Sequence, residues 1–84
     1  MTYTVTIERG AQKDIAALSR TDRTRVLAAI KKLADDPRPS GCKKLAGRSD
    51  YRIRVGSIRV IYDINDGELV VTVLSVGQRG DIYR

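Results

Sequence analysis

The fold is decided by the stretch DYRIRVGSIRVIYDI, which spans residues 50–64. In this stretch, apolar residues alternate with mostly charged ones on either side of Gly56 and Ser57, and this alternation is typical of β-strands joined by a tight turn. If Gly56 and Ser57 form a two-residue loop, Tyr51 lies opposite Tyr62 and one face of the hairpin is continuously apolar. The sequence therefore predicts a β-hairpin that packs one face into the core.

The opposite face of this predicted hairpin carries Arg52, Arg54 and Arg59. The same register places Arg54 directly opposite Arg59, and like charges at opposed positions of a sheet are destabilising. Such a pair is most easily understood if an anion normally binds against it. The alternative is that the arginines form the solvated face of an amphipathic sheet. Both interpretations stay open on these residues alone, and the arginines are the first candidates for a functional site.

Length and charge narrow the class of protein. The chain has 84 residues, which suit a single domain over residues 1–84 with one core. It carries 16 lysines and arginines against 10 aspartates and glutamates, a net charge of +6. This charge favours nucleic acid or an acidic protein as the partner, although a solvated basic surface would give the same composition.

The residue types and motifs that the sequence lacks restrict the chemistry further. There is no histidine, which removes the usual general base and the usual metal ligand. The single cysteine excludes an internal disulfide and fits a reducing cytoplasm. No apolar run reaches membrane-spanning length, and neither a phosphate-binding glycine loop nor a dinucleotide motif is present. We therefore expect a cytoplasmic protein that needs no cofactor, no metal and no membrane.

The N-terminal half predicts one strand and a pair of helices. Residues 2–8 alternate threonines with apolar residues, as a half-buried strand does. The spacing of the next apolar residues predicts a short amphipathic helix over residues 11–19. A second helix is expected to be capped by Thr21 and to end at Asp36, because Pro37 disfavours helical geometry in the residue before it.

The C-terminal half predicts further strands. A turn-rich connector at residues 37–41 precedes a brief strand at 43–45, and the turn signal at residues 65–68 separates the hairpin from a last strand at 69–74. The element order is then β-α-α-β-β-β. It predicts an α+β fold in which a small, mostly antiparallel sheet of about four strands packs on the N-terminal helix pair. The first strand should join this sheet at an edge or beside the last strand.

The register of the last strand can also be predicted. A two-residue turn at residues 66–67 would place Tyr62 opposite Val71 and Arg59 opposite Leu74. This pairing continues the apolar face of the hairpin. It also makes the arginine-bearing face only partly polar, so that a ligand or another part of the chain is expected to cover it in part.

Several short motifs follow the expected strand and helix pair. They are Asp-Asp-Pro at residues 35–37, Lys-Lys-Leu-Ala-Gly at 43–47, Tyr-Arg-Ile-Arg-Val-Gly at 51–56, Ile-Arg-Val-Ile-Tyr at 58–62, and Val-Leu-Ser-Val-Gly-Gln-Arg at 73–79 with a following Tyr83. In their order and spacing, these motifs resemble the RelE/ParE family of bacterial toxins from type II toxin–antitoxin systems. The resemblance covers essentially the whole chain.

The resemblance implies one of two activities. RelE-type members imply cleavage of mRNA in the ribosomal A site, and ParE-type members imply inhibition of DNA gyrase without nuclease activity. The chain is more similar to the RelE type. It is therefore expected to be a metal-independent endoribonuclease whose partners are mRNA, the ribosome and a cognate antitoxin that neutralises it.

The resemblance also implies the site residues. The expected catalytic residues are Arg54, Arg59, Arg79 and Tyr83. The expected RNA-binding residues are Arg52, Lys43, Lys44 and Arg48. In a site of this kind, an RNA 2′-hydroxyl attacks its own adjacent phosphate while guanidinium groups neutralise the charge that develops. The proton acceptor is not identified, because arginine is effectively never deprotonated. Tyr83 could stack on a base, orient the 2′-hydroxyl, or act as the base if the cationic surroundings lower its pKa, and stacking is the least demanding of these roles.

Overall fold

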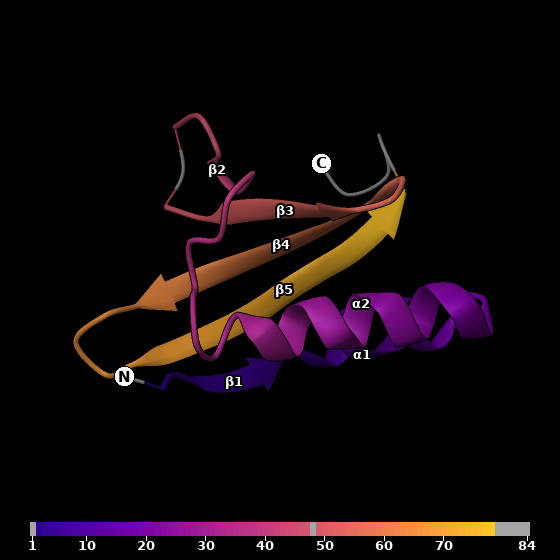
Figure 1. Cartoon of the computed structure of the whole chain (residues 1–84), viewed down its shortest axis with the longest axis horizontal. Coiled ribbons are helices and arrows are strands. Elements are labelled where there is room, and N and C mark those ends of the chain that lie inside the picture. Colours follow the sequence, from indigo (N-terminus) through magenta and orange to yellow (C-terminus); the bar gives the residue numbers. More distant parts are fainter. Residues whose placement is uncertain (1, 48, 79–84) are drawn as a thin grey trace.

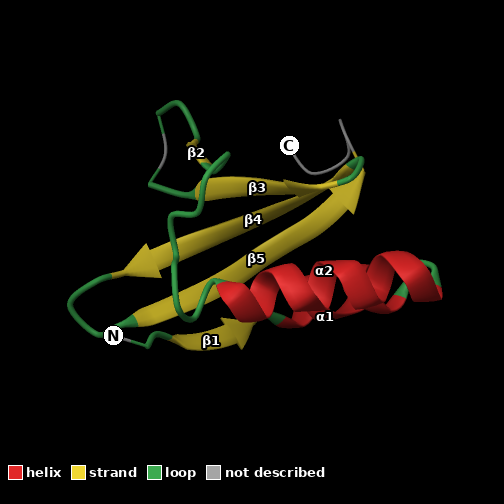
Figure 2. Ribbon diagram, in the orientation of Figure 1, coloured by secondary structure: helices red, strands yellow, loops and turns green. Residues whose placement is uncertain are grey.

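The structure is a computed structural model that describes residues 2–47 and 49–78, and it forms a sheet with both helices on one side (Figures 1 and 2). The elements are, in chain order, β1 (Thr4–Ile7), α1 (Arg9–Ala16), α2 (Arg20–Lys32), β2 (Lys43–Lys44), β3 (Tyr51–Val55), β4 (Ile58–Asn65) and β5 (Val70–Gln78). The predicted α+β fold and the predicted element order are confirmed, with the brief strand expected near residue 43 present as β2.

The strands lie in the order β1-β5-β4-β3-β2. β1 runs parallel to β5, whereas every other neighbouring pair is antiparallel. The first strand therefore lies both at an edge and beside the last strand, as predicted. The described sheet has five strands rather than about four, because β2 adds a short edge strand to β3.

The hairpin formed by β3 and β4 has the predicted register. Tyr51 pairs with Tyr62, and Arg54 pairs with Arg59. Gly56 in the turn has a φ of 62°, a conformation that a residue without a Cβ adopts without strain. The apolar face of this hairpin lies in a core that also contains buried residues of both helices and of β5.

The register of β5 differs from the prediction. Tyr62 pairs with Val73 rather than Val71, and Arg59 pairs with Gly77 rather than Leu74. The loop is longer than a two-residue turn, because Asn65 already pairs with Val70 and the turn includes Leu69 at a φ of 57°. The apolar face is nevertheless preserved near the loop, since a shift by two residues keeps each side chain on the same side of a strand.

A β-bulge causes the rest of the register shift. Tyr62 pairs with Val73 whereas Ile61 pairs with Ser75, so that Leu74 is an extra residue in β5. Beyond this bulge Val60 pairs with Val76, and both are buried. The bulge thus returns the apolar side chains of β5 to the core face after one unpaired residue.

The helix limits also differ from the prediction. The N-cap of α2 is Ser19, not Thr21, because the backbone of Ser19 is extended and its hydroxyl accepts a hydrogen bond from the N–H of Asp22 at 3.2 Å. α1 ends at Ala16, since Ser19 is already committed to starting the next helix. α2 ends at Lys32 and is followed by turns rather than continuing to Asp36.

Candidate nucleic-acid interface

The strands place five of the predicted basic residues on the two faces of the sheet. Directly paired residues share a face, so the pairs of Arg54 with Arg59 and of Lys43 with Arg52 all lie on the side of the sheet away from the core against the helices. We call this side the arginine face. Lys44 pairs with Tyr51 and therefore points to the opposite side. The structure thus brings Lys43, but not Lys44, to the same face as the hairpin arginines.

A hollow at the tip of the hairpin is lined by Arg54, Gly56, Ser57 and Arg59, and it has a volume of about 350 Å³. We call it the arginine hollow. The Arg54 side chain is exposed, and Arg59 is half-buried. Cationic side chains on paired strands repel each other, and an anion between them would convert this repulsion into charge-assisted hydrogen bonds. The arginine hollow is therefore suited to a phosphate group.

The end of β5 lies beside the arginine hollow. Gln78, the last residue of this strand, pairs with Ile58, and the hydroxyl of Ser57 donates a long hydrogen bond to the Gln78 side-chain oxygen at 3.5 Å. Arg79, Tyr83 and Arg48, which the sequence analysis also assigned to the site, lie outside the described residues. The described part of the site is thus the arginine face and the strand end beside it.

Arg52 lies on the arginine face but is buried. Only 6% of its surface is exposed, and its partner Ile61 is 2% exposed. A guanidinium group with so little exposed surface is poorly placed to make the first contact with a long RNA strand. The assignment of Arg52 to RNA binding stays a prediction.

Sequence reasoning missed a cluster of polar contacts around Arg38. The Arg38 guanidinium donates to both carboxylate oxygens of Asp66, at 3.2 and 2.9 Å, and to the hydroxyl of Tyr51 at 3.3 Å. The hydroxyl of Tyr3 donates to the same Asp66 carboxylate at 2.7 Å. These hydrogen bonds lower the pKa of Asp66, and those from Arg38 have a larger effect than the one from Tyr3. The cluster joins the connector to the first strand and to the loop before β5.

No local pattern marks Arg38, which stands between Pro37 and Pro39 in a stretch without periodicity. Its partner Asp66 lies 28 positions away along the chain. The only signal available from the sequence is the general one that an aspartate in a turn and an arginine in a connector can pair. The cluster lies at the loop end of β4 and β5, so we assign it to stability rather than to the site.

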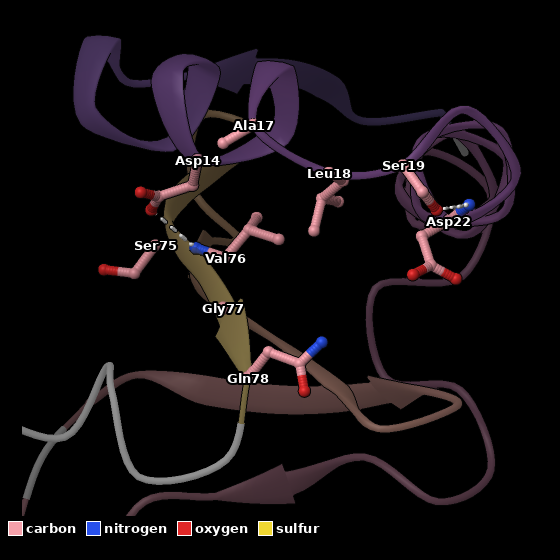
Figure 3. Close-up of a pocket in the computed structure, with 9 residues that line it drawn as sticks. All are labelled: Asp14, Ala17, Leu18, Ser19, Asp22, Ser75, Val76, Gly77 and Gln78. Atoms are coloured by element: carbon pink, nitrogen blue, oxygen red, sulfur yellow. Dashed lines mark hydrogen bonds between the residues drawn. The ribbon is translucent and has the colours of Figure 1, made fainter.

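A second hollow, of about 570 Å³, lies between the helices and the end of β5 (Figure 3). It is lined by Asp14, Ala17, Leu18, Ser19, Asp22, Ser75, Val76, Gly77 and Gln78. Asp14 accepts a hydrogen bond from the backbone N–H of Val76 at 3.1 Å, which fixes α1 against β5. The carboxylates of Asp14 and Asp22 make this hollow unsuitable for a phosphate, in contrast to the arginine hollow.

Two further properties bear on the chemistry. Within residues 2–47 and 49–78, no three side chains of histidine, cysteine, aspartate or glutamate gather closely enough to hold a metal ion. Neither helix of the described chain is long and apolar enough to cross a membrane.

The chain is a small basic α+β protein, and the solved structures that it resembles include RelE toxins. The archaeal RelE of a RelE–RelB complex from Pyrococcus horikoshii is 32% identical and superposes with a TM-score of 0.84, covering 96% of this chain and 99% of that one. RelE in the intact RelBE complex of Escherichia coli is 29% identical with a TM-score of 0.79, covering 90% of this chain and 95% of the other.

Sequence comparisons identify the family. A relative from Escherichia coli, described as a RelE-like toxin protein, is 28% identical over 99% of this chain and 92% of its own length. The model of the ParE toxin of the type II toxin–antitoxin system parDE matches residues 5–83. The chain belongs to the RelE/ParE family of toxins from type II toxin–antitoxin systems, as its motifs predicted.

Proposed function

We propose that this toxin is a ribosome-dependent endoribonuclease that cleaves mRNA in the ribosomal A site without a metal ion. The observation that supports it best is the arginine hollow, where Arg54 and Arg59 lie directly opposite each other on adjacent strands. A paired set of fixed guanidinium groups is the arrangement expected around a phosphate that gains negative charge during reaction.

In the proposed reaction, the 2′-hydroxyl of a nucleotide attacks the adjacent phosphorus. The bond between the 2′-oxygen and phosphorus forms, the bond to the 5′-oxygen of the next nucleotide breaks, and a 2′,3′-cyclic phosphate remains. Arg54 and Arg59 hold the non-bridging oxygens as their charge increases. The 2′-hydroxyl releases its proton as it attacks, and the leaving 5′-oxygen, which Arg79 stabilises, takes one up, so that no proton is gained or lost overall. Tyr83 stacks on a base, orients the 2′-hydroxyl or accepts its proton.

The substrate supplies the nucleophile in this scheme, so the protein needs no activated serine or cysteine. Its contribution is to position the phosphate and to stabilise charge. Removal of one such donor in enzymes of other kinds costs on the order of 10²–10³ in rate. We expect similar losses for Arg54→Ala and Arg59→Ala.

The family and its solved relatives support two further parts of the proposal. The Pyrococcus horikoshii and Escherichia coli structures are complexes with RelB antitoxins. We infer that this toxin is likewise held inactive by a cognate antitoxin. We also infer that it acts in the cytoplasm, where ribosomes and mRNA are found.

The test is to induce the gene and map the ends of cellular mRNA by primer extension. New ends inside reading frames, present only on translated messages and absent in Arg59→Ala and Arg79→Ala, would support the proposal. Arg20→Ala is the matched control, because it removes an exposed arginine at the start of α2 that does not line the arginine hollow. Toxicity that survives both site substitutions would contradict the assignment of the site.

A second candidate is inhibition of DNA gyrase. It is favoured by the match to the ParE toxin model over residues 5–83. This candidate predicts intact mRNA, accumulated DNA breaks and induction of the SOS response after the gene is induced. The same cultures distinguish the two candidates, because their RNA and DNA can be examined in parallel.

A further inference from the structure

Arg25 of α2 lies directly against the turn of the β3–β4 hairpin. A Cβ placed on Gly56 would lie 3.3 and 3.4 Å from the terminal nitrogens of the Arg25 guanidinium and 3.7 Å from its central carbon. Both terminal nitrogens are nearer than the central carbon, so the end of the guanidinium group that carries them points towards Gly56. The first half of α2 thus brings a positive charge to the tip of the hairpin, although the two are separate in the sequence.

The charge of Arg25 is only weakly compensated. Its nearest acidic partner among the described residues is Asp22, whose carboxylate oxygen lies 4.0 Å from a guanidinium nitrogen, at the limit of an ion pair. More than half of the Arg25 side chain, 55%, is exposed. An exposed pair at this distance contributes little to stability. The guanidinium donors of Arg25 therefore remain available to another anion.

Gly56 connects Arg25 to the arginine hollow. The glycine lies next to the terminal nitrogens of the Arg25 guanidinium and also lines the hollow together with Arg54, Ser57 and Arg59. Three neighbouring guanidinium groups suit a polyanion such as a nucleic-acid strand, which presents several phosphates in a row. A single phosphate in the hollow would leave Arg25 uncompensated, whereas a strand with several phosphates would not.

We propose that Arg25 binds the phosphate next to the one held by Arg54 and Arg59, so that the RNA backbone passes around the hairpin tip towards α2. This inference rests on the proposed RNA substrate and extends its binding site from the sheet to a helix. Arg25 is a binding residue in this scheme and takes no part in bond breaking. Its contact with a phosphate is electrostatic and independent of sequence.

The test measures binding of a short single-stranded RNA whose 2′-hydroxyls are all methylated, so that it cannot be cleaved. Each phosphate contact to a single strand contributes about 0.7 to the slope of log K against log salt concentration. We expect Arg25→Gln to weaken binding and to flatten this slope by about 0.7. Lys31→Gln is the matched control, because it removes the same charge from an exposed position in the last turn of α2.

The outcomes separate this inference from the proposed function. A slope for Arg25→Gln equal to that of the wild type would overturn the inference, as would an equal loss in Lys31→Gln, which would indicate only a general effect of charge. Absence of any binding to RNA would overturn it too. If Arg25→Gln flattens the slope but the wild-type protein cleaves no mRNA, the contact stands and the endoribonuclease proposal falls.

Discussion

Arg54 and Arg59 are directly opposed partners on β3 and β4, and together they line the arginine hollow. An arrangement suited to phosphate binding is thus unfavourable for stability, since like charges on directly opposed residues of a sheet are destabilising. Arg54→Gln keeps most of the side chain and removes one of the two charges. We expect it to raise the free energy of unfolding of the isolated protein by a few tenths to about 1 kcal/mol, while cleavage is lost.

Urea denaturation at low and high salt checks this expectation. The increase in unfolding free energy for Arg54→Gln should become smaller as salt is added, because exposed charges are screened. Arg20→Gln, on the helix side, is the control for a general effect of net charge. A lower stability of Arg54→Gln at low salt would show that Arg54 stabilises the free protein and that the paired arginines do not repel each other.

Tyr62 holds the connector to the core. Its ring is fully buried and lies 6.0 Å from the ring of Tyr51, and its hydroxyl donates a hydrogen bond to the backbone oxygen of Pro37 at 2.7 Å. Tyr62→Phe leaves that buried oxygen without its donor, which should cost about 1–3 kcal/mol of unfolding free energy. In the control Tyr51→Phe, the lost hydrogen bond to Arg38 is exposed, and the change in urea midpoint should be much smaller. Equal losses in both variants would contradict the buried hydrogen bond.

The same tyrosine predicts a loss of stability in alkali. Burial, the largest cause, raises the pKa of Tyr62 above its ordinary value of about 10. The folded state therefore holds this proton more tightly than the unfolded state, so its contribution is fully present below pH ~10 and decreases as the pH rises above it. As the pH rises above ~10, the unfolding free energy of Tyr62→Phe should therefore fall less steeply than that of the wild type. If the unfolding free energy of Tyr62→Phe fell with pH as steeply as that of the wild type, Tyr62 would ionise freely in the folded protein.

These contacts show what the sequence could and could not predict. The register of the β3–β4 hairpin followed from alternation and a glycine turn, so the pairing of Arg54 with Arg59 was predicted correctly. The register of β5 was not, because a bulge at Leu74 leaves no signal in a run of apolar residues. Contacts between distant segments, such as Arg25 with Gly56, depend on how the helices pack on the sheet.

The cluster around Asp66 predicts a loss of stability in acid. Hydrogen bonds from Arg38 and then Tyr3 lower the pKa of Asp66, so its contribution is present above the ordinary carboxylate pKa of about 4 and is lost as the pH falls below it. Asp66→Asn should therefore destabilise the protein at neutral pH, and its difference from the wild type should narrow in this acid range. Asp35→Asn, at an exposed position after α2, is the control. A difference that stays constant down to the lowest pH would contradict the lowered pKa.

Lys43 and Lys44 form a matched pair for testing which side of the sheet meets RNA. Both are exposed and adjacent in β2, but Lys43 pairs with Arg52 on the arginine face and Lys44 pairs with Tyr51 on the other. Successive side chains of a strand point to opposite sides. Lys43→Gln should therefore weaken RNA binding and reduce the slope of log K against log salt concentration by about 0.7. Lys44→Gln should leave this slope unchanged. The two variants have the same net charge and the same loss of a lysine from an edge strand. An equal effect of both would mean that charge alone, and not the arginine face, attracts the RNA, and a larger effect of Lys44→Gln would place the RNA on the helix side.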